Sequence, residues 1–283
     1  TMTDFLTAGK SGGMFVMVCT YIGAHVGNGI VVGGAQYGAE YGIGGVWFGL
    51  GACLSYVLFA LVMSRLLYTR GYITIPDLIR DRYKSKFASV LMAILNICAT
   101  LGIMAAQIMA GCALFEALGL NPTLGGVLMA VVVFIYCSIS GMWGVMMTDS
   151  VQTMVILFST IFCIVTIAMH GGFDTISAAL PESSFDFVPF TGERLVMMMV
   201  PGALNGLISG AAYQRTASCK DKKVAFWSPM IAAVALIPFV VMPVIIGMYG
   251  KALFPDAPTA SILFKVVLED MNPIVAGLMI AAV

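Results

Sequence analysis

Charge is scarce in this sequence, and the residues that build catalytic centres are scarcer still. Only 10% of the 283 residues are charged, fourteen Lys and Arg balance fourteen Asp and Glu, and histidine occurs twice. A soluble domain is nearer a quarter charged, so this chain lacks the surface that water requires. The zero net charge offers no footprint for nucleic acid. The seven cysteines include no CxxC pair, and no nucleophile–base pair is evident, so we expect neither an enzyme nor a bound cofactor.

Apolar residues are what the sequence has in abundance. They make up 60% of the chain, and the mean hydropathy is +0.99. About 20 apolar residues cross a bilayer as one helix, which predicts an all-α polytopic membrane protein. The predicted spans cover residues 12–33, 45–67, 87–118, 124–139, 145–169, 194–213 and 224–249, and an eighth starts near Pro273.

The segments between and after these spans complete the predicted organisation. We expect residues 171–193 to form a polar loop and residues 260–270 a short surface helix. The last uncharged run, residues 274–283, is about half the length of a span. We therefore expect a fragment of a longer protein, with about seven full spans and the start of an eighth.

The distribution of Lys and Arg predicts the orientation. With residues 1–11 in the cytoplasm, eleven basic residues face inward and only Arg194, Lys251 and Lys265 face outward. Basic residues concentrate on the cytoplasmic side of membrane proteins, so this bias favours a multi-pass protein of the cell membrane in that orientation. The inward set is Lys10, Arg65, Arg70, Arg80, Arg82, Lys84, Lys86, Arg215, Lys220, Lys222 and Lys223.

The first span contains residues that weaken a helix. Residues 23–29 hold three glycines together with His25 and Asn28, and each glycine costs about 1 kcal/mol in a helix relative to alanine. Polar side chains at membrane depth are candidates for function. Close helix packing through small residues is the alternative, but it explains the glycines without explaining His25 and Asn28.

The sixth span has the same character. Pro201 and Gly202 interrupt it, and Asn205 and Ser209 follow one turn apart. A simple kink would account for this span alone. Two interrupted spans, five apart, are typical of an inverted-repeat transporter with its solute site at the midplane.

Asp149 lies near the start of the fifth predicted span, with Gln152 nearly one turn deeper. A carboxylate inside a membrane span points to an ion or solute pathway. The alternative is an interfacial helix cap, which also suits a carboxylate near a helix start.

Five segments in order resemble the sodium:solute symporter family, which includes sodium-coupled sugar, proline and pantothenate carriers. They are the Asp-Phe-Leu-Thr-Ala-Gly-Lys of residues 4–10, the glycine-rich residues 23–42 ending in Tyr-Gly, the Thr-Ile-Pro-Asp of residues 74–77 with the Arg-Tyr at 82–83, the Thr-Asp-x-x-Gln ending residues 141–152, and the Gln-Arg of residues 214–221 with its Lys-Asp. The resemblance runs from one end of the chain to the other.

The resemblance implies a LeuT-like helical bundle of two inverted five-helix repeats, truncated here. The first repeat would be residues 12–169, and residues 194–283 would form an incomplete second one. Backbone carbonyls near Gly23 and Val26 would hold sodium, with hydroxyls that should follow Val283. Asp149 matches an aspartate implicated in a further sodium site or exit path. Asn205 replaces the aromatic inner gate of the sugar carriers.

These observations predict a sodium-coupled symporter that imports a small organic solute, such as an organic acid, an amino acid or a vitamin-like compound, by alternating access. Its partners would be Na⁺, the solute and the bilayer, and no oligomeric state is predicted. No cationic residue is expected at mid-span to pair with an anionic solute. Proton coupling through His25 or Asp149 and a transporter-like sensor are the alternatives. The candidate solute-binding residues are His25, Asn28, Gln36, Gln107, Asn205 and Ser209.

Overall fold

Helices make up nearly all of the computed structural model, which describes residues 2–282. The side chains of residues 2, 3, 28, 113, 117, 136–140, 281 and 282 lie outside the described part. Within that part there is no strand, and the extended pairing is one parallel backbone bridge between Gly12 and Cys219. The all-α architecture predicted from composition is confirmed.

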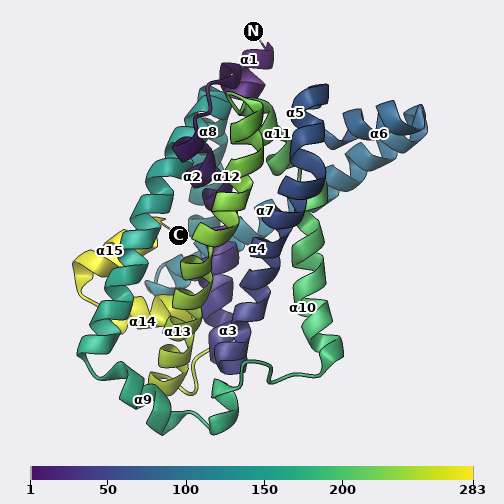
Figure 1. Cartoon of the computed structure of the whole chain (residues 1–283). Helices are drawn as coiled ribbons and strands as arrows, with labels where there is room; N and C mark the ends of the chain where they lie inside the picture. Colours follow the sequence, from purple (N-terminus) through teal and green to yellow (C-terminus); the bar gives the residue numbers. More distant parts are fainter. Residues whose placement is uncertain (1, 283) are drawn as a thin grey trace. The chain divides into compact units, whose positions relative to one another are not determined.

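Figure 1 shows the helices in chain order. They are α1 (Met2–Thr7), α2 (Met14–Gly23), α3 (Gly33–Tyr41), α4 (Val46–Phe59), α5 (Arg65–Arg70), α6 (Ile75–Tyr83), α7 (Lys86–Ala117), α8 (Pro122–Met169), α9 (Gly172–Ala179), α10 (Gly192–Asn205), α11 (Gly210–Ser218), α12 (Lys222–Ala235), α13 (Ile237–Leu253), α14 (Ile262–Asp270) and α15 (Pro273–Ala282). Short 3₁₀ or π turns are η1 (Ala8–Lys10), η2 (Asn28–Val32), η3 (Gly42–Gly45), η4 (Ala60–Ser64), η5 (Glu182–Phe185), η6 (Gly206–Ile208) and η7 (Thr259–Ser261).

Each apolar segment predicted as a span contains helix. Among the described residues, four helical stretches are long and apolar enough to cross a membrane, and a bent pair would make a fifth. The four are Gly29–Arg70, Lys86–Glu116, Gly141–Met169 and Lys222–Leu253, and the pair is Gly192–Ile208 with Gly210–Ser218. Met14–Gly23 and Pro122–Ile135 are apolar but shorter. The expected seven spans therefore include interrupted and short helices, as befits a multi-pass membrane protein.

The polar segments between spans are more helical than expected. The predicted loop 171–193 contains α9 and η5, and the segment between α5 and α7 contains α6. The helix predicted at residues 260–270 is α14, but most of it is buried, including Ile262, Phe264 and Val267, so its expected position at the surface is wrong. Short amphipathic helices were missed because their apolar residues are too few to stand out beside the spans.

Two compact units interleave along the chain. The first comprises Thr1–Tyr21, Tyr56–Asp149 and Leu204–Ala232, and the second comprises Ile22–Ser55, Ser150–Ala203 and Ala233–Val283. They are not the two sequence repeats, which stay a prediction.

In the second unit, α3 and α13 lie side by side (Figure 1). Glycines make this approach possible, because a Cβ at Gly38 would meet the Val244 carbonyl and a Cβ at Gly247 would meet that of Ala35. Small residues let helix backbones approach closely in membranes, where van der Waals packing replaces the hydrophobic effect. Either glycine replaced by a larger residue would push the two helices apart.

In the first unit, α6 packs against the start of α7 and begins with a well-formed cap (Figure 1). Thr74 and Asp77 exchange side-chain and backbone hydrogen bonds in a capping box, with proline in the first turn. Asp81 at the far end accepts from the Tyr72 hydroxyl and pairs with Lys84 Nζ at 2.9 Å. The Tyr72 hydrogen bond, followed by Lys84, lowers the pKa of this exposed carboxyl.

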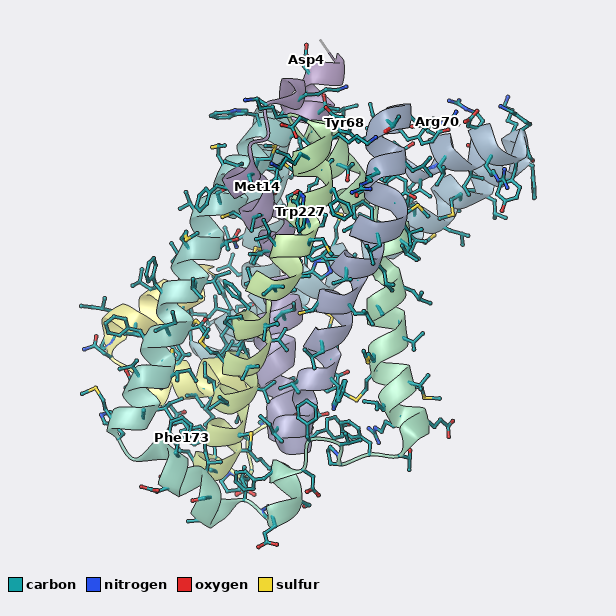
Figure 2. The ribbon with its side chains drawn as sticks, in the orientation of Figure 1. Asp4, Met14, Tyr68, Arg70, Phe173 and Trp227 are labelled. Atoms are coloured by element: carbon teal, nitrogen blue, oxygen red, sulfur yellow. The ribbon has the colours of Figure 1, made fainter. Side chains whose placement is uncertain are left out.

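Figure 2 places Tyr68 and Arg70 on α5 of the same unit. The Lys10 ammonium lies 5.9 Å from the Tyr68 ring centroid, and the Tyr68 hydroxyl donates to the Lys220 carbonyl at 3.2 Å. The end of α5 is thus linked to η1 and to the segment after α11.

Candidate functional site

The first predicted span is interrupted where the sequence indicates. Helix α2 ends at Gly23, residues 24–27 form turns, and a π turn starts at Asn28. The amides of His25 and Val26 both donate to the Ile22 carbonyl at 2.9 Å, so the regular helical ladder ends there. Gly27 has a φ of 152°, a value that favours glycine over residues with a side chain. The predicted break is confirmed.

The sixth predicted span is also interrupted, but later than the proline suggested. Pro201 lies inside α10, and the break falls at Ser209, whose backbone is extended (φ −82°, ψ 110°). Gly192–Ile208 and Gly210–Ser218 meet there at a bend of 44°. The expectation that Pro201 breaks the helix is wrong. Pro201 is in the third turn of α10 and the helix continues past it, as neighbouring groups in membrane proteins often permit.

Asp149 pairs with Arg215, a residue that sequence reasoning placed among the cytoplasmic loop charges. Arg215 Nη2 donates to Asp149 Oδ2 at 2.9 Å, and the two side chains are 8% and 13% exposed. Asp149 lies inside α8, about two turns beyond Gly141, so its interpretation as a helix cap is wrong. Without Arg215 the inward set of basic residues falls from eleven to ten, and the orientation bias persists.

Thr20 completes this ion pair from α2. Its hydroxyl donates to the same carboxylate oxygen, Oδ2, that Arg215 binds. Arg215 Nε in turn donates to the Thr20 carbonyl at 2.9 Å, and its Nη1 donates to the Ala211 carbonyl at 3.3 Å. Charge-assisted hydrogen bonds of this kind are stronger than neutral ones, so the end of α2, the middle of α8 and the end of α11 are held together.

Tyr21 extends the network just before the first break. Its hydroxyl lies 2.9 Å from Thr216 Oγ1, and its carbonyl accepts from the Tyr56 hydroxyl. Tyr21 and Tyr56 also stack edge to face with ring centroids 5.3 Å apart. All three side chains are buried. A buried polar network in which every described member is paired makes the local structure rigid.

The start of α2 is also joined to the end of α11. Gly12, just before α2, donates to the Ser218 carbonyl and accepts from the Lys220 amide, each at 3.0 Å. A Cβ at Gly12 would meet the Met17 side chain and the Ser218 carbonyl, so only glycine fits. Helices α2 and α11, which precede the first break and follow the second, are therefore tied along their length within one unit.

The solute residues predicted from the sequence divide between the two units: His25, Asn28 and Gln36 belong to the second, and Gln107, Asn205 and Ser209 belong to the first. Gln36 donates to Glu40 at 3.0 Å, and Thr259 donates to that same carboxylate at 2.8 Å. Gln107 is exposed on α7, and Asn205 is exposed at the end of α10. His25 is partly buried within the first break, Ser209 forms the second, and the Asn28 side chain lies outside the described part.

The predicted sodium ligands fall in different units. Gly23 and Val26 flank the first break in the second unit, whereas Asp149 belongs to the first. The described residues contain no group of three or more His, Cys, Asp or Glu that would hold a transition metal.

Sequence reasoning missed Thr20, Tyr21, Tyr56 and Arg215. The available signal was the arginine itself, because a charged side chain in a helix that follows an apolar segment needs a partner. Its position beside the lysines of residues 220–223 made it resemble a loop charge instead.

Comparison with known proteins identifies the family of this chain. The family model for the sodium:solute symporter family matches residues 5–283. The chain belongs to that family. The family and its named relatives are transporters rather than enzymes.

Two relatives illustrate the extent of the similarity. The sodium/pantothenate symporter of Haemophilus influenzae is 27% identical over 99% of this chain and 61% of its own length. Sodium/glucose cotransporter 1 of Sus scrofa is 28% identical over 62% of this chain and 27% of its own length. The chain thus spans about three fifths of the pantothenate symporter.

A solved structure of a Na⁺-coupled sialic acid symporter in a substrate-bound outward-open state shares the fold. The TM-score is 0.80 at 17% identity, with 100% of this chain and 63% of that protein covered. The LeuT-like architecture implied by the sequence motifs is confirmed.

Proposed function

We propose that the protein is a sodium-coupled symporter that moves a small organic solute by alternating access. The observation that carries the proposal is the pair of interrupted helices whose half-helices α2 and α11 are joined by Thr20, Tyr21 and Arg215. Transporters of this architecture place their solute and ion sites at such breaks. Relatives named as a sodium/pantothenate symporter and a sodium/glucose cotransporter support the same activity.

The sodium site belongs to this proposal. Carbonyls near Gly23 and Val26 would supply hard oxygen ligands at the end of α2, where the helical ladder stops. Asp149 would serve ion binding or release, and Arg215 would compete with the ion for its carboxylate. The driving force is sufficient, because one charge moving through 100 mV releases about 2.3 kcal/mol.

The proposed solute contacts include polar residues of the two interrupted segments. His25 and Asn28 lie at the first break, and Asn205 and Ser209 lie at the second, so their backbones adjoin the interrupted segments. Gln36 and Gln107 remain candidates with less support, since Gln36 binds Glu40 and Gln107 is exposed. The inverted repeats at residues 12–169 and 194–283, the cytoplasmic placement of residues 1–11, and insertion in the cell membrane complete the proposal.

Uptake into proteoliposomes tests the function. The protein in its full cellular length would be reconstituted and given radiolabelled pantothenate, glucose and choline under an inward sodium gradient at clamped pH. We expect uptake of one solute class that ceases when potassium replaces sodium. Uptake driven by a proton gradient without sodium would instead establish proton coupling, and binding without uptake would favour the sensor.

A further inference from the structure

A cavity of about 560 Å³ lies within the second unit, and none of the solute or sodium residues predicted from the sequence lines it. Its volume is within the range of about 300–1,000 Å³ that small-molecule sites occupy. The lining comes from α3, α4, α10 and the segment before α10. It consists of Tyr37, Tyr41, Phe48, Thr191, Glu193, Arg194, Met197, Met198, Pro201 and Gly202.

Stacked aromatic rings build one wall of this cavity. Phe48 stacks on Tyr37 with centroids 4.6 Å apart and an interplanar angle of 18°. Tyr37 stacks on Tyr41 at 5.8 Å, and Phe190 meets Tyr41 edge to face at 5.5 Å. Such rings offer a flat apolar surface with little conformational freedom to lose on binding a ligand.

Arg194 extends this stack with a positive charge. Its guanidinium lies 4.9 Å from the Tyr41 ring centroid, and its Nη2 donates to the Tyr41 hydroxyl. A guanidinium has five N–H donors in a fixed fork that fits a carboxylate, and cation–π stacking orients it. The Tyr41 contacts therefore fix Arg194 while leaving further donors of the fork for a ligand.

The segment that carries Arg194 into the cavity is held in place. Trp47 Nε1 donates to the Phe187 carbonyl at 2.7 Å. A Cβ at Gly42 would meet the Ser184 carbonyl, and a Cβ at Gly44 would meet the Pro189 ring. The turn η3 therefore packs against this segment only because these two positions are glycine. A site whose recognition group is positioned in advance loses less free energy when a ligand binds.

We propose that this cavity receives a small organic monocarboxylate with an apolar or aromatic body. Arg194 binds the carboxylate, and Tyr37 and Phe48 pack against the body. Glu193 also lines the cavity, so the lining carries one positive and one negative charge and accepts one carboxylate better than two. This inference rests on the proposed function, because it names the class of solute that the symporter would admit.

Binding in sodium-free potassium buffer tests the site without transport. Radiolabelled benzoate and hexanoate are the probes, benzamide is their neutral counterpart, phthalate is a dicarboxylate, and the protein is used in its full cellular length. We expect benzoate to bind and benzamide to bind weakly. Arg194→Gln should lower benzoate affinity about 10- to 100-fold, the effect of losing hydrogen bonds to a charged group. Arg194→Lys should lie between, because it keeps the charge and loses the fork.

Two further variants keep the test decisive. Arg82→Gln removes an exposed arginine in the other unit and should leave benzoate binding unchanged. Glu193→Gln should raise phthalate affinity relative to benzoate. Equal binding of benzoate and benzamide, no binding of either labelled carboxylate at millimolar concentration, or an Arg194→Gln variant that elutes as folded protein and binds like wild type would overturn the inference.

The outcome is separable from that of the proposed function. Arg194-dependent benzoate binding without any sodium-driven uptake would refute symport and leave the cavity as a carboxylate site. Sodium-driven uptake with Arg194-independent binding would refute the cavity alone.

Discussion

Removing one partner of the Asp149–Arg215 pair should destabilise the protein far more than removing both. Both side chains are almost fully buried, with 13% and 8% exposed, and their nitrogen and oxygen are 2.9 Å apart. Asp149→Asn leaves the Arg215 guanidinium buried, and its remaining acceptors among the described residues are neutral: the Thr20 carbonyl and hydroxyl and the Ala211 carbonyl. Breaking a buried pair in this way costs about 3 kcal/mol or somewhat more, which is about a 100-fold change in the ratio of folded to unfolded protein.

A double-mutant cycle measures the interaction. Asp149→Asn, Arg215→Met and the double variant would be unfolded with denaturant in mixed micelles, and the free energies of unfolding compared with wild type. We expect each single variant to lose about 3 kcal/mol and the double variant to lose only about 1 kcal/mol, so that most of the summed loss is recovered. The matched control is Lys84→Met, which breaks a pair of the same 2.9 Å length whose side chains are 78% and 44% exposed. It should cost much less than either buried variant, because water screens an exposed pair.

Additive effects would refute this reasoning. If the double variant loses the sum of the two single losses within about 0.5 kcal/mol, the residues are not coupled. The cycle also bears on sodium. Asp149→Asn alone would change both the proposed ion ligand and the stability of the protein, so the double variant, once shown to be stable, is the appropriate protein for measuring sodium affinity.

Three further predictions follow from other parts of the molecule. A cysteine at Ser183 should react with a membrane-impermeant thiol reagent from outside intact cells, above the level of the unsubstituted protein. Labelling only in inverted vesicles would show that the protein has the opposite orientation. Gly27→Leu should abolish sodium-driven uptake but not membrane insertion, because the φ of 152° at Gly27 suits glycine. The control Gly102→Leu, with nothing within 4 Å of a Cβ, should transport normally, and equal uptake by the two variants would show that transport does not need the break. Tyr72→Phe should raise the pKa of Asp81 towards its usual 3.8, as measured by carboxyl NMR, because the lost hydrogen bond is the main cause of the lowered pKa. This hydrogen bond stabilises the fold above pH 3.8, and its contribution is lost as the pH falls through the lowered pKa, so an unchanged pKa in the variant would contradict the prediction.

The helices and their interruptions could be predicted because local sequence determines them. Runs of apolar residues require helix in a bilayer, and the glycines between Gly23 and Gly29 mark a break that the structure has at residues 24–27. The second break was predicted to the correct segment but not to Ser209, since the position of a break depends on which neighbours satisfy the freed backbone groups.

The contacts that organise the site could not be predicted from the sequence. Asp149 and Arg215 are far apart along the chain, and nothing local shows which buried cation meets which carboxylate. The cap at the start of α6, however, could have been predicted from the sequence. Thr74, Pro76 and Asp77 have the spacing of a helix start, and the polar composition around them concealed it.

The hydrogen bonds between α2 and α11 limit how many combinations of conformations the two half-helices can adopt. Two hinges that moved independently would give four combinations, two of them with one half-helix displaced and the other at rest. The backbone bonds of Gly12 and the contacts of Arg215 and Tyr21 make such mixed combinations costly, because each would break several hydrogen bonds at once. A carrier that leaks does so through mixed states, in which an ion can cross without its solute. In the proposed symporter, the same bonds that hold the two half-helices together would therefore keep the ratio of ion to solute fixed.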